Sequence, residues 1–178
     1  EGDFELLEKA GSEKGFEVER AQTLEFEGER ISSSRVRESL ANGDFELAKA
    51  LMGRPYSIMG RVVYGRQLGR QLGVPTANVR LQRYRSALEG VYSVSVDGLD
   101  VGRKNGIANI GIRPTVGGKE PLLEVHLFDF SGDIYGHLIS VTFHQKIRDE
   151  QQFASIELLK AQIEKDIVQS QDWFLSNA

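Results

Sequence analysis

The spacing of apolar residues along this 178-residue chain changes near residue 56. Before that point the spacing is helical, and it predicts one helix over roughly residues 4–15 and a helical hairpin over residues 31–54. After it, apolar and polar residues alternate, which is typical of strands with one buried face. The helical period returns at Ser155 and predicts an amphipathic closing helix of about 20 residues.

Capping residues divide the hairpin into two helices. A serine run leads into a first helix over Arg35–Leu40, and Asn42-Gly43 ends it. Asp44 begins a second helix over Phe45–Met52. We also expect a short strand around Glu17–Thr23. The apolar positions with helical spacing are Val36, Leu40, Phe45, Ala48 and Leu51 in the hairpin, and Ile156, Leu159, Ile163, Ile167 and Phe174 in the closing helix.

The strand segments follow one another with short turns and no helices between them. Asp97-Gly98 is the strongest hairpin signal in the chain. Before it, Tyr92, Val94 and Val96 share one face of a strand. This order predicts a mainly β fold, an antiparallel Greek-key or meander barrel. The predicted strands are Ile58–Tyr64, Val91–Val96, Leu99–Gly102, Asn105–Ile110, Leu122–Phe130 and Leu138–Ile147.

The formal net charge is -4, but the charge is distributed unevenly. Residues 57–118 carry nine basic and three acidic residues, and the segments on either side are acidic. A local positive field suits a small polyanion such as a nucleotide better than a long nucleic acid, although a solvated surface would carry the same charges. The chain has no cysteine and three histidines, which excludes thiolate sites and disfavours zinc.

The first residues contain no apolar signal core. No run of about 18 apolar residues occurs in the chain. We therefore expect a soluble, cytoplasmic protein with no membrane partner.

Glycines mark a candidate anion-binding loop between residues 60 and 78. Four of them interrupt a strand and the loop after it, namely Gly60, Gly65, Gly69 and Gly73. Glycine lets backbone amides approach an anion closely, and Arg70 adds positive charge beside them. The spacing is neither a Walker A loop nor a dinucleotide-binding fingerprint, and a flexible loop would use glycines equally.

Thr76 and Asn78 form a candidate metal-binding pair. They are two residues apart after the stiffening Pro75, so their side chains point the same way in an extended segment. A hydroxyl and an amide oxygen are hard, neutral ligands that suit Mg²⁺ arriving with a nucleotide. The alternative is a turn that these side chains stabilise by themselves.

Other polar side chains are weaker candidates. Glu124 lies in the middle of a predicted strand with His126 on the same face, and such a glutamate often faces solvent. His126, His137 and His144 lack metal-ligand spacing and suit surface or hydrogen-bonding roles. The segment Asp133–Gly136 is typical of a turn.

Six motifs occur in an order that resembles one enzyme family. They are Gly65…Gly73-Val-Pro-Thr-Ala-Asn78, Gly90-Val-Tyr92, Asn109–Thr115, Glu124-Val-His126, Asp133–Gly136, and Lys146–Glu150 with Phe153. From about residue 55 onward the chain resembles the riboflavin kinase module of bacterial bifunctional riboflavin kinase/FAD synthetases. Residues 1–54 resemble the tail of the FMN adenylyltransferase domain of those enzymes. Because the family's upstream adenylylation motif is absent from this sequence, we expect no FAD synthesis by this chain alone.

The resemblance implies a fold and a reaction. Residues 55–178 would form a six-stranded antiparallel Greek-key barrel with a C-terminal helix, preceded by a helical remnant over residues 1–54. The substrates would be ATP and riboflavin, with Mg²⁺ as cofactor. The γ-phosphoryl of ATP would pass to the riboflavin 5′-hydroxyl, giving FMN and ADP.

The resemblance also implies site residues. Thr76 and Asn78 match the residues that hold Mg²⁺ and the nucleotide phosphates, and Glu124 matches the catalytic base. Gly65, Gly73 and Arg70 match a flap that covers the phosphates. Arg148, on a later loop, matches a residue near both substrates, and Asn109 opens a loop beside the same cleft.

Two other functions stay open from the sequence. A barrel that binds a flavin or nucleotide without turnover would keep the fold, although Thr76, Asn78 and Glu124 together argue against it. An oligonucleotide-binding barrel would use the six arginines between residues 57 and 88, and its binding would depend steeply on salt. The acidic net charge and the absence of an aromatic stacking ladder weaken that function, so we expect no nucleic-acid partner.

Overall fold

The structure is a computed structural model that describes residues 3–20, 22–65, 69, 72–81, 86–115 and 118–177. Contacts within the chain divide it into two units, residues 1–32 and residues 33–178. The assignment of residues 1–54 and 55–178 to two different enzyme domains stays a prediction.

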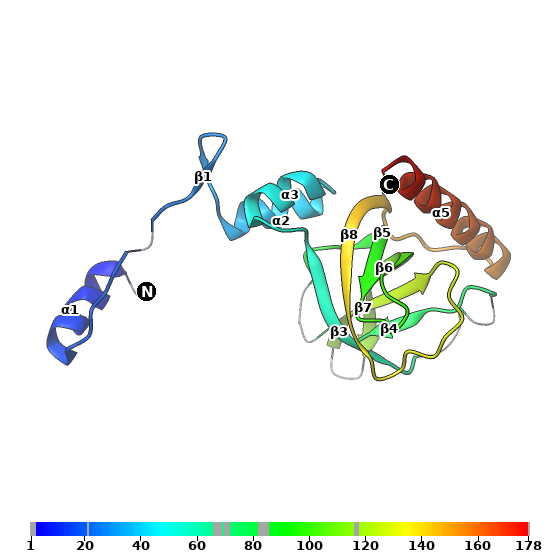
Figure 1. The fold of residues 1–178 in the computed structure, drawn as a ribbon, viewed down its shortest axis with the longest axis horizontal. Helices are drawn as coiled ribbons and strands as arrows, with labels where there is room; N and C mark the ends of the chain where they lie inside the picture. The colour runs from blue at the N-terminus through cyan, green and yellow to red at the C-terminus, as the bar shows by residue number, and fades with distance from the viewer. Residues whose placement is uncertain are drawn as a thin grey trace. The chain divides into compact units, whose positions relative to one another are not determined.

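The first unit contains helix α1 (Phe4–Lys14) and a short hairpin (Figure 1). The Asp3 carboxylate begins α1 by accepting a hydrogen bond from the Leu6 amide at 2.9 Å. Gly15 ends the helix in a left-handed conformation. The predicted helix over residues 4–15 is therefore confirmed.

The strand predicted around Glu17–Thr23 is wrong. The described residues of that segment form no strand, and the chain pairs with itself later, between β1 (Glu25–Phe26) and β2 (Glu29–Arg30). Between these strands, Glu27 and Gly28 have φ values of 57° and 77°. Positive φ at two successive residues is the conformation of a tight hairpin turn, so the turn sets where the pairing occurs.

The second unit begins with the predicted helical hairpin, formed by α2 (Ser33–Ala41) and α3 (Phe45–Met52). The Asp44 carboxylate accepts a hydrogen bond from the Leu47 amide at 2.9 Å and begins α3. The hairpin is therefore confirmed. Its buried apolar side chains are Leu40, Phe45, Ala48 and Leu51.

Aromatic contacts pack the helical hairpin against the strands that follow. The Phe45 ring meets the edge of Tyr92 at a centroid distance of 5.8 Å and stacks on Phe143 at 6.5 Å. The Tyr92 hydroxyl donates a hydrogen bond to the Glu89 carbonyl at 2.7 Å. Burial raises the pKa of Tyr92 to about 12, so the hydroxyl stays a donor.

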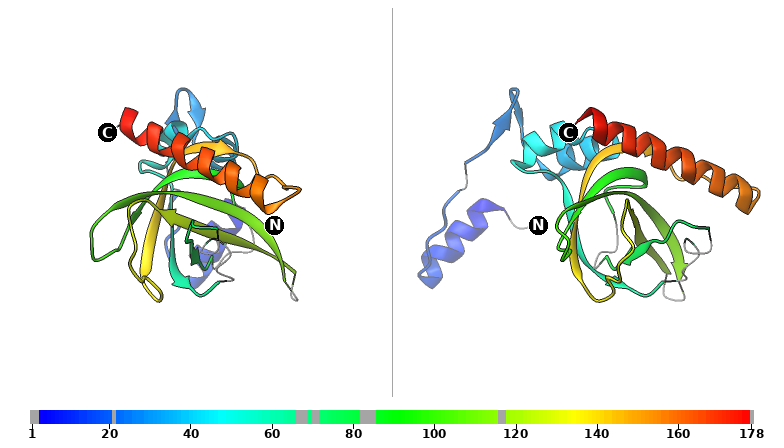
Figure 2. Two further views of the ribbon diagram at one scale, coloured as in Figure 1. Left: turned by 90° about the vertical axis from the view of Figure 1, so that its right-hand side faces the viewer. Right: turned by 45° about the vertical axis from the view of Figure 1, so that its right-hand side comes forward.

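Six strands form a closed antiparallel barrel in the order β3-β4-β7-β6-β5-β8 (Figures 1 and 2). Strands β5, β6 and β7 follow one another, and β8 returns to lie beside β5, which is a Greek key and confirms the predicted fold class. Side chains alternate between the packed interior and the outer face. The strands are β3 (Ser57–Val63), β4 (Ala77–Val79), β5 (Gly90–Asp97), β6 (Lys104–Thr115), β7 (Gly118–Leu127) and β8 (Leu138–Arg148).

Three strand predictions need correction. Leu99–Gly102 is not a strand, because the Gly102 amide donates to the Leu99 carbonyl at 3.0 Å and closes a turn. The following strand is longer than predicted, since β6 continues from Lys104 to Thr115. The strand predicted over Leu122–Phe130 ends earlier, at Leu127.

Helix α5 (Ile156–Ser176) confirms the predicted closing helix and lies against β5, β6 and β8 (Figure 2). Beneath it, Val91 and Ile107 form a buried cluster on the outer face of the barrel. Ile156 was predicted to share the packed face but is 65% exposed. None of the helices in the described ranges has the length and apolar character that crossing a membrane requires.

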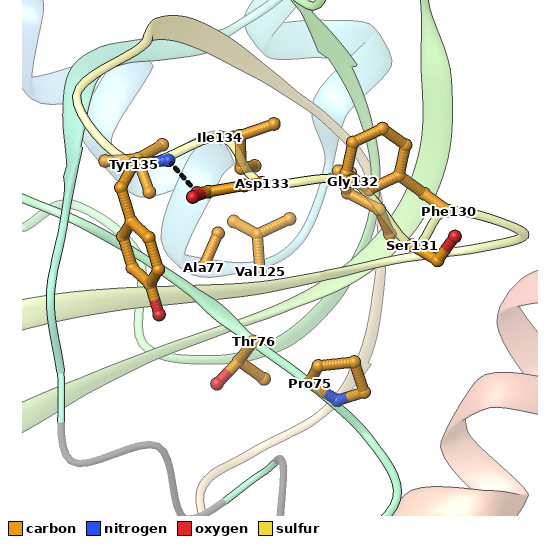
Figure 3. A pocket seen from close by; sticks show the side chains of 12 residues that line it. Pro75, Thr76, Ala77, Val125, Phe130, Ser131, Gly132, Asp133, Ile134 and Tyr135 are labelled. Carbon is orange, nitrogen blue, oxygen red and sulfur yellow. Dashed lines mark hydrogen bonds between the residues drawn. The ribbon is translucent and has the colours of Figure 1, made fainter.

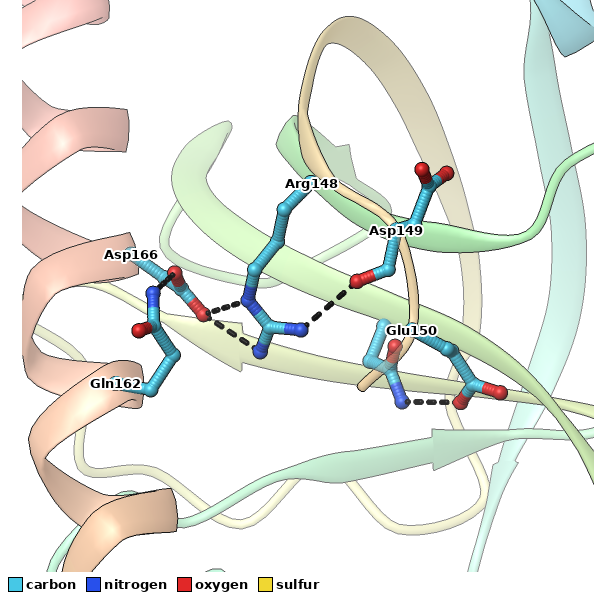
Figure 4. A network of polar contacts seen from close by, with 6 residues as sticks. Arg148, Asp149, Glu150, Gln162 and Asp166 are labelled. Atoms are coloured by element: carbon cyan, nitrogen blue, oxygen red, sulfur yellow. Dashed lines mark hydrogen bonds and ion pairs between the residues drawn. The ribbon is translucent and has the colours of Figure 1, made fainter. Parts of the chain in front are cut away.

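A buried ion pair ties α5 to the end of β8 (Figure 4). Both Nε and Nη2 of Arg148 lie 2.8 Å from Oδ2 of Asp166, and Gln162 donates to Oδ1 of Asp166 at 2.8 Å. The Arg148 and Asp166 side chains are only 15% and 3% exposed. Each charge is therefore compensated where water cannot screen it.

Replacing Asp166 with Asn should lower the free energy of unfolding by about 3–5 kcal/mol, because the buried Arg148 guanidinium loses its counter-charge. Urea unfolding monitored by circular dichroism measures that free energy. The double variant Arg148→Met/Asp166→Leu is the matched control and should recover most of the loss, since apolar side chains replace both charges. An Asp166→Asn chain as stable as the wild type would contradict a stabilising role for the Arg148–Asp166 ion pair.

His144 on β8 lies beneath the C-terminal end of α5. Its ring stacks on Trp173 at a centroid distance of 5.3 Å, and its Nε2 lies 2.9 Å from the Ser95 hydroxyl. Burial lowers the pKa of His144, and the positive charge of Arg103 acts in the same direction. The imidazole is therefore held neutral in the folded chain at pH values where an exposed histidine is charged.

Acidification should weaken the fold through His144. Below about pH 6.5 the unfolded chain binds a proton that the folded chain resists, so the free energy of unfolding falls as the pH falls. Urea unfolding across this range should show a smaller decline for His144→Gln than for the wild type. Equal slopes for His144→Gln and the wild type would count against this effect.

Candidate active site

Strand register brings three of the predicted site residues into one row. Asn78 of β4 pairs with Glu124 of β7, and Glu124 pairs with Asn109 of β6. Directly opposite residues share a face of the sheet, with Cβ atoms about 5 Å apart. The flanking Leu123 and Val125 belong to the barrel core, so the row lies on the outer face. The predicted strand Asn105–Ile110 contained Asn109, whereas the family resemblance placed it in a loop; the structure has it within β6.

Thr76 lies just before β4, at the edge of a cavity of about 430 Å³ at one end of the barrel (Figure 3). In Figure 3, Phe130–Tyr135 lie across the cavity from Pro75 and Thr76, with Ala77 and Val125 between them. The cavity is thus a space between the barrel end and the loop that joins β7 to β8. The residues that line it are Val62, Pro75, Thr76, Ala77, Val125, Leu127, Phe130, Ser131, Gly132, Asp133, Ile134 and Tyr135.

The cavity wall on the β7–β8 loop is a part of the site that the sequence analysis missed. Asp133 does form the predicted turn, since its carboxylate accepts a hydrogen bond from the Tyr135 amide at 2.9 Å. The turn also places Ile134 and Tyr135 against the cavity, and the Tyr135 ring stacks on Tyr64 at 3.8 Å. The sequence did offer one signal: Ile134 and Tyr135 are apolar residues in a turn whose geometry does not require them.

Two glycines allow the chain after β3 to touch the candidate metal-binding pair. A Cβ on Gly65 would lie 2.2 Å from Nδ2 of Asn78. A Cβ on Gly69 would lie 2.3 Å from the Val74 carbonyl oxygen and 3.1 Å from Oγ1 of Thr76. Any larger residue would have to displace these groups, so the close approach depends on glycine.

The other two predicted flap residues are Gly73 and Arg70. Gly73 follows in a left-handed conformation, with φ of 81° and open space around its Cα. Arg70 lies outside the described residues.

The row continues from Asn109 through Val91 to Arg148, which lies at its far end from Asn78. Arg148 is the last residue of β8 rather than part of a loop, and its guanidinium is bound to Asp166. It pairs with Val91, so three strand spacings of about 4.8 Å separate it from Glu124 along the sheet. Its position supports a role in holding α5 and the segment after β8.

Glu150 adds a second carboxylate next to Asn109, and sequence analysis gave it no role. Nδ2 of Asn109 donates to Oε1 of Glu150 at 3.4 Å (Figure 4). Gly111 makes room for this carboxylate, since a Cβ there would lie 2.0 Å from the same oxygen. Oδ1 of Asn109 is buried and has no hydrogen-bond partner within the described part of the chain. Asn109 thus offers an unused acceptor beside Glu124.

Nδ1 of His126 lies 2.9 Å from the Pro75 carbonyl oxygen. This contact confirms the hydrogen-bonding role expected for His126. It also links β7, the strand of Glu124, to the peptide that precedes Thr76.

The donor set of Thr76 and Asn78 fits a magnesium ion bound together with phosphates. Both donors are neutral oxygens, and the Asn78 side chain is 4% exposed and lies against Gly65. Mg²⁺ keeps waters and phosphate oxygens in its coordination shell, so two protein ligands suffice. Across the described residues, no three His, Asp or Glu side chains could hold a metal ion by themselves. The site therefore suits an ion that arrives with a nucleotide.

Comparisons with known proteins point to one family. A bifunctional riboflavin kinase/FMN adenylyltransferase of Pseudomonas fluorescens is 56% identical over 93% of this chain and 53% of that protein. A protein of the same name from Escherichia coli K12 is 51% identical over 98% of this chain and 56% of that protein. The chain thus spans about half the length of the curated relatives it matches.

A solved structure named as a macrolide-efflux protein from Streptococcus pneumoniae has a similar fold. The match covers 93% of this chain and 53% of the solved chain, with a TM-score of 0.71 and 34% sequence identity. The family model described as "Flavokinase: Riboflavin kinase" matches residues 52–174, which is more than half of the chain. The chain therefore belongs to the riboflavin kinase family.

Proposed function

We propose that this chain transfers the γ-phosphoryl group of ATP to the 5′-hydroxyl of riboflavin, giving FMN and ADP. The observation that carries the proposal is a spatial order. The cavity adjoins Thr76, Thr76 precedes Asn78 on one face, and the register places Glu124 and then Asn109 beside Asn78. In this order the cavity would take the nucleotide base, Thr76 and Asn78 the phosphates, Glu124 the reacting hydroxyl and Asn109 the acceptor substrate.

The cavity is the proposed place for the nucleotide base. Its walls are mainly apolar and include the Tyr135 ring, which suits a flat heterocycle, and its volume of about 430 Å³ suits a small ligand. Thr76 lies at its edge, so the phosphates of a nucleotide seated there would reach Thr76 and Asn78. Arg70 and the loop amides after Gly65 are proposed to neutralise charge on the transferring phosphoryl group.

Thr76 and Asn78 are the residues proposed to hold Mg²⁺. The ion would supply positive charge to the phosphate oxygens while the phosphoryl group transfers. The protein's contribution is to fix two neutral oxygens next to Glu124 without adding a negative charge that would repel the phosphates.

Glu124 is the proposed catalytic base. Its carboxylate would accept the proton of the riboflavin 5′-hydroxyl while the alcohol oxygen bonds to the γ-phosphorus. The bond from that phosphorus to the β,γ-bridging oxygen breaks, and its electrons leave with ADP. Asn109 and Glu150 lie on the far side of Glu124 from Asn78 and are proposed to hydrogen-bond the ribityl hydroxyls.

Arg148 is proposed to act through other residues. Arg148 binds Asp166, and its Nη1 also donates to the Asp149 carbonyl at 3.0 Å, which fixes the chain just before Glu150.

A cytoplasmic location stays a prediction. The relatives are named for two activities, but this sequence lacks the adenylylation motif, so we expect FMN and no FAD from the chain.

A turnover assay tests the proposal directly. The purified chain, given riboflavin, ATP and Mg²⁺, should form FMN, and removing divalent cations with a chelator should abolish the reaction because the phosphate charge is then unbalanced. Chromatography separates riboflavin, FMN and FAD. Tight binding of both substrates without product would instead support a flavin- or nucleotide-binding barrel.

Glu124→Gln should reduce kcat by about 10²–10⁴-fold with little change in substrate binding, because it removes the base and keeps the side-chain shape. Steady-state kinetics combined with calorimetric binding of ATP separates the two effects. Glu164→Gln, an exposed change on α5, is the matched control and should keep wild-type kcat. Near-normal turnover by Glu124→Gln would remove Glu124 from the role of base.

A further inference from the structure

A proline interrupts the strand pairing next to the proposed phosphate site. Strand β4 pairs with β7 from Val79 to Ala77, where the recorded pairing ends. Two residues further, Pro75 has no backbone N–H, so it cannot donate to a neighbouring strand. Its carbonyl oxygen still accepts, and Nδ1 of His126 lies 2.9 Å from it. A carbonyl only accepts, so Nδ1 carries the proton.

We infer that His126 is a positioning residue for Thr76. The inference rests on the proposed function, in which Thr76 holds the nucleotide phosphates and their ion. The Pro75 carbonyl belongs to the peptide bond that joins Pro75 to Thr76. A hydrogen bond to this oxygen therefore restrains the backbone from which the Thr76 hydroxyl projects.

The neighbouring contacts show why a further restraint is needed at this point. On one side, the Val74 amide donates to the Gly69 carbonyl at 2.8 Å and holds the preceding turn. On the other side, the ladder begins at Ala77. The peptide between Pro75 and Thr76 lies between these two restraints, and the His126 hydrogen bond fixes it to the barrel.

The position of His126 also couples two parts of the proposed chemistry. His126 and Glu124 are two residues apart on β7, so their side chains lie on the same outer face. One strand thus carries the proposed base and holds the segment that carries Thr76. An edge-on contact between the His126 ring and Phe128, with centroids 6.0 Å apart, keeps the ring in place.

Three substitutions separate a positioning role from a packing role. His126→Ala removes the donor. His126→Asn places an amide nitrogen near the position of Nδ1 and can restore the hydrogen bond. His126→Gln places its nitrogen further along the side chain, near the position of Nε2, where the Pro75 carbonyl is out of line.

We expect His126→Ala and His126→Gln to raise the KM for ATP with Mg²⁺ by about 3- to 10-fold, the usual effect of one lost hydrogen bond. The KM for riboflavin should stay within about 2-fold, and His126→Asn should restore the KM for ATP. The inference is overturned by an unchanged KM for ATP in His126→Ala, by an equal rise in both KM values, or by His126→Asn behaving like His126→Ala.

Amide hydrogen exchange tests the tie without turnover. In His126→Ala, exchange at Thr76 and Ala77 should accelerate, while exchange at Val94 in the barrel core stays at the wild-type rate. Unchanged exchange at Thr76 and Ala77 overturns the inference. If the wild-type chain forms no FMN, the proposed function fails, whereas the exchange comparison still decides whether His126 holds this segment.

Discussion

The pairing of the three-residue strand β4 with β7 is the contact on which the site depends. It sets Asn78 beside Glu124, although 45 positions of sequence lie between them. Because side chains alternate along a strand, a slip of β4 by one residue would turn Asn78 into the core and expose Val79. Val79 is fully buried, so the apolar interior holds the register that the chemistry requires.

The outer face of the barrel is divided between packing and chemistry. Helix α5 covers β5, β6 and β8, and its most buried side chains, Asp166 and Ser170, are polar. The Arg148–Asp166 ion pair holds the helix against the barrel. Glu150 follows Arg148 by two residues, and its carboxylate accepts a hydrogen bond from Asn109 in the row. A charge pair that contacts neither proposed substrate thus helps to place a group that borders the site.

Local patterns in the sequence predicted much of the fold, and long-range contacts account for what it missed. Caps such as Asp44 and the spacing of Thr76 and Asn78 act within a few residues, so they can be read from a single chain. Barrel closure sets which residues neighbour Glu124, and no local spacing encodes it. The sequence pattern made Glu124 a weak candidate, and the family resemblance gave it the predicted role of base. The same limit explains why the sequence did not predict the ion pair between Arg148 and Asp166, which lies on the separate helix α5. It also explains why the cavity wall around Tyr135 was not predicted.

The central claim is that Thr76 and Asn78 meet the nucleotide's metal ion beside Glu124. Replacing Mg²⁺ with paramagnetic Mn²⁺ in the presence of ATP tests it in an isotope-labelled chain, because the ion broadens the resonances of nearby nuclei. We expect the strongest broadening at Thr76, Asn78 and Glu124, and much weaker broadening at Arg148. Strongest broadening at the Arg148 end of the barrel, or at no defined place, would contradict it.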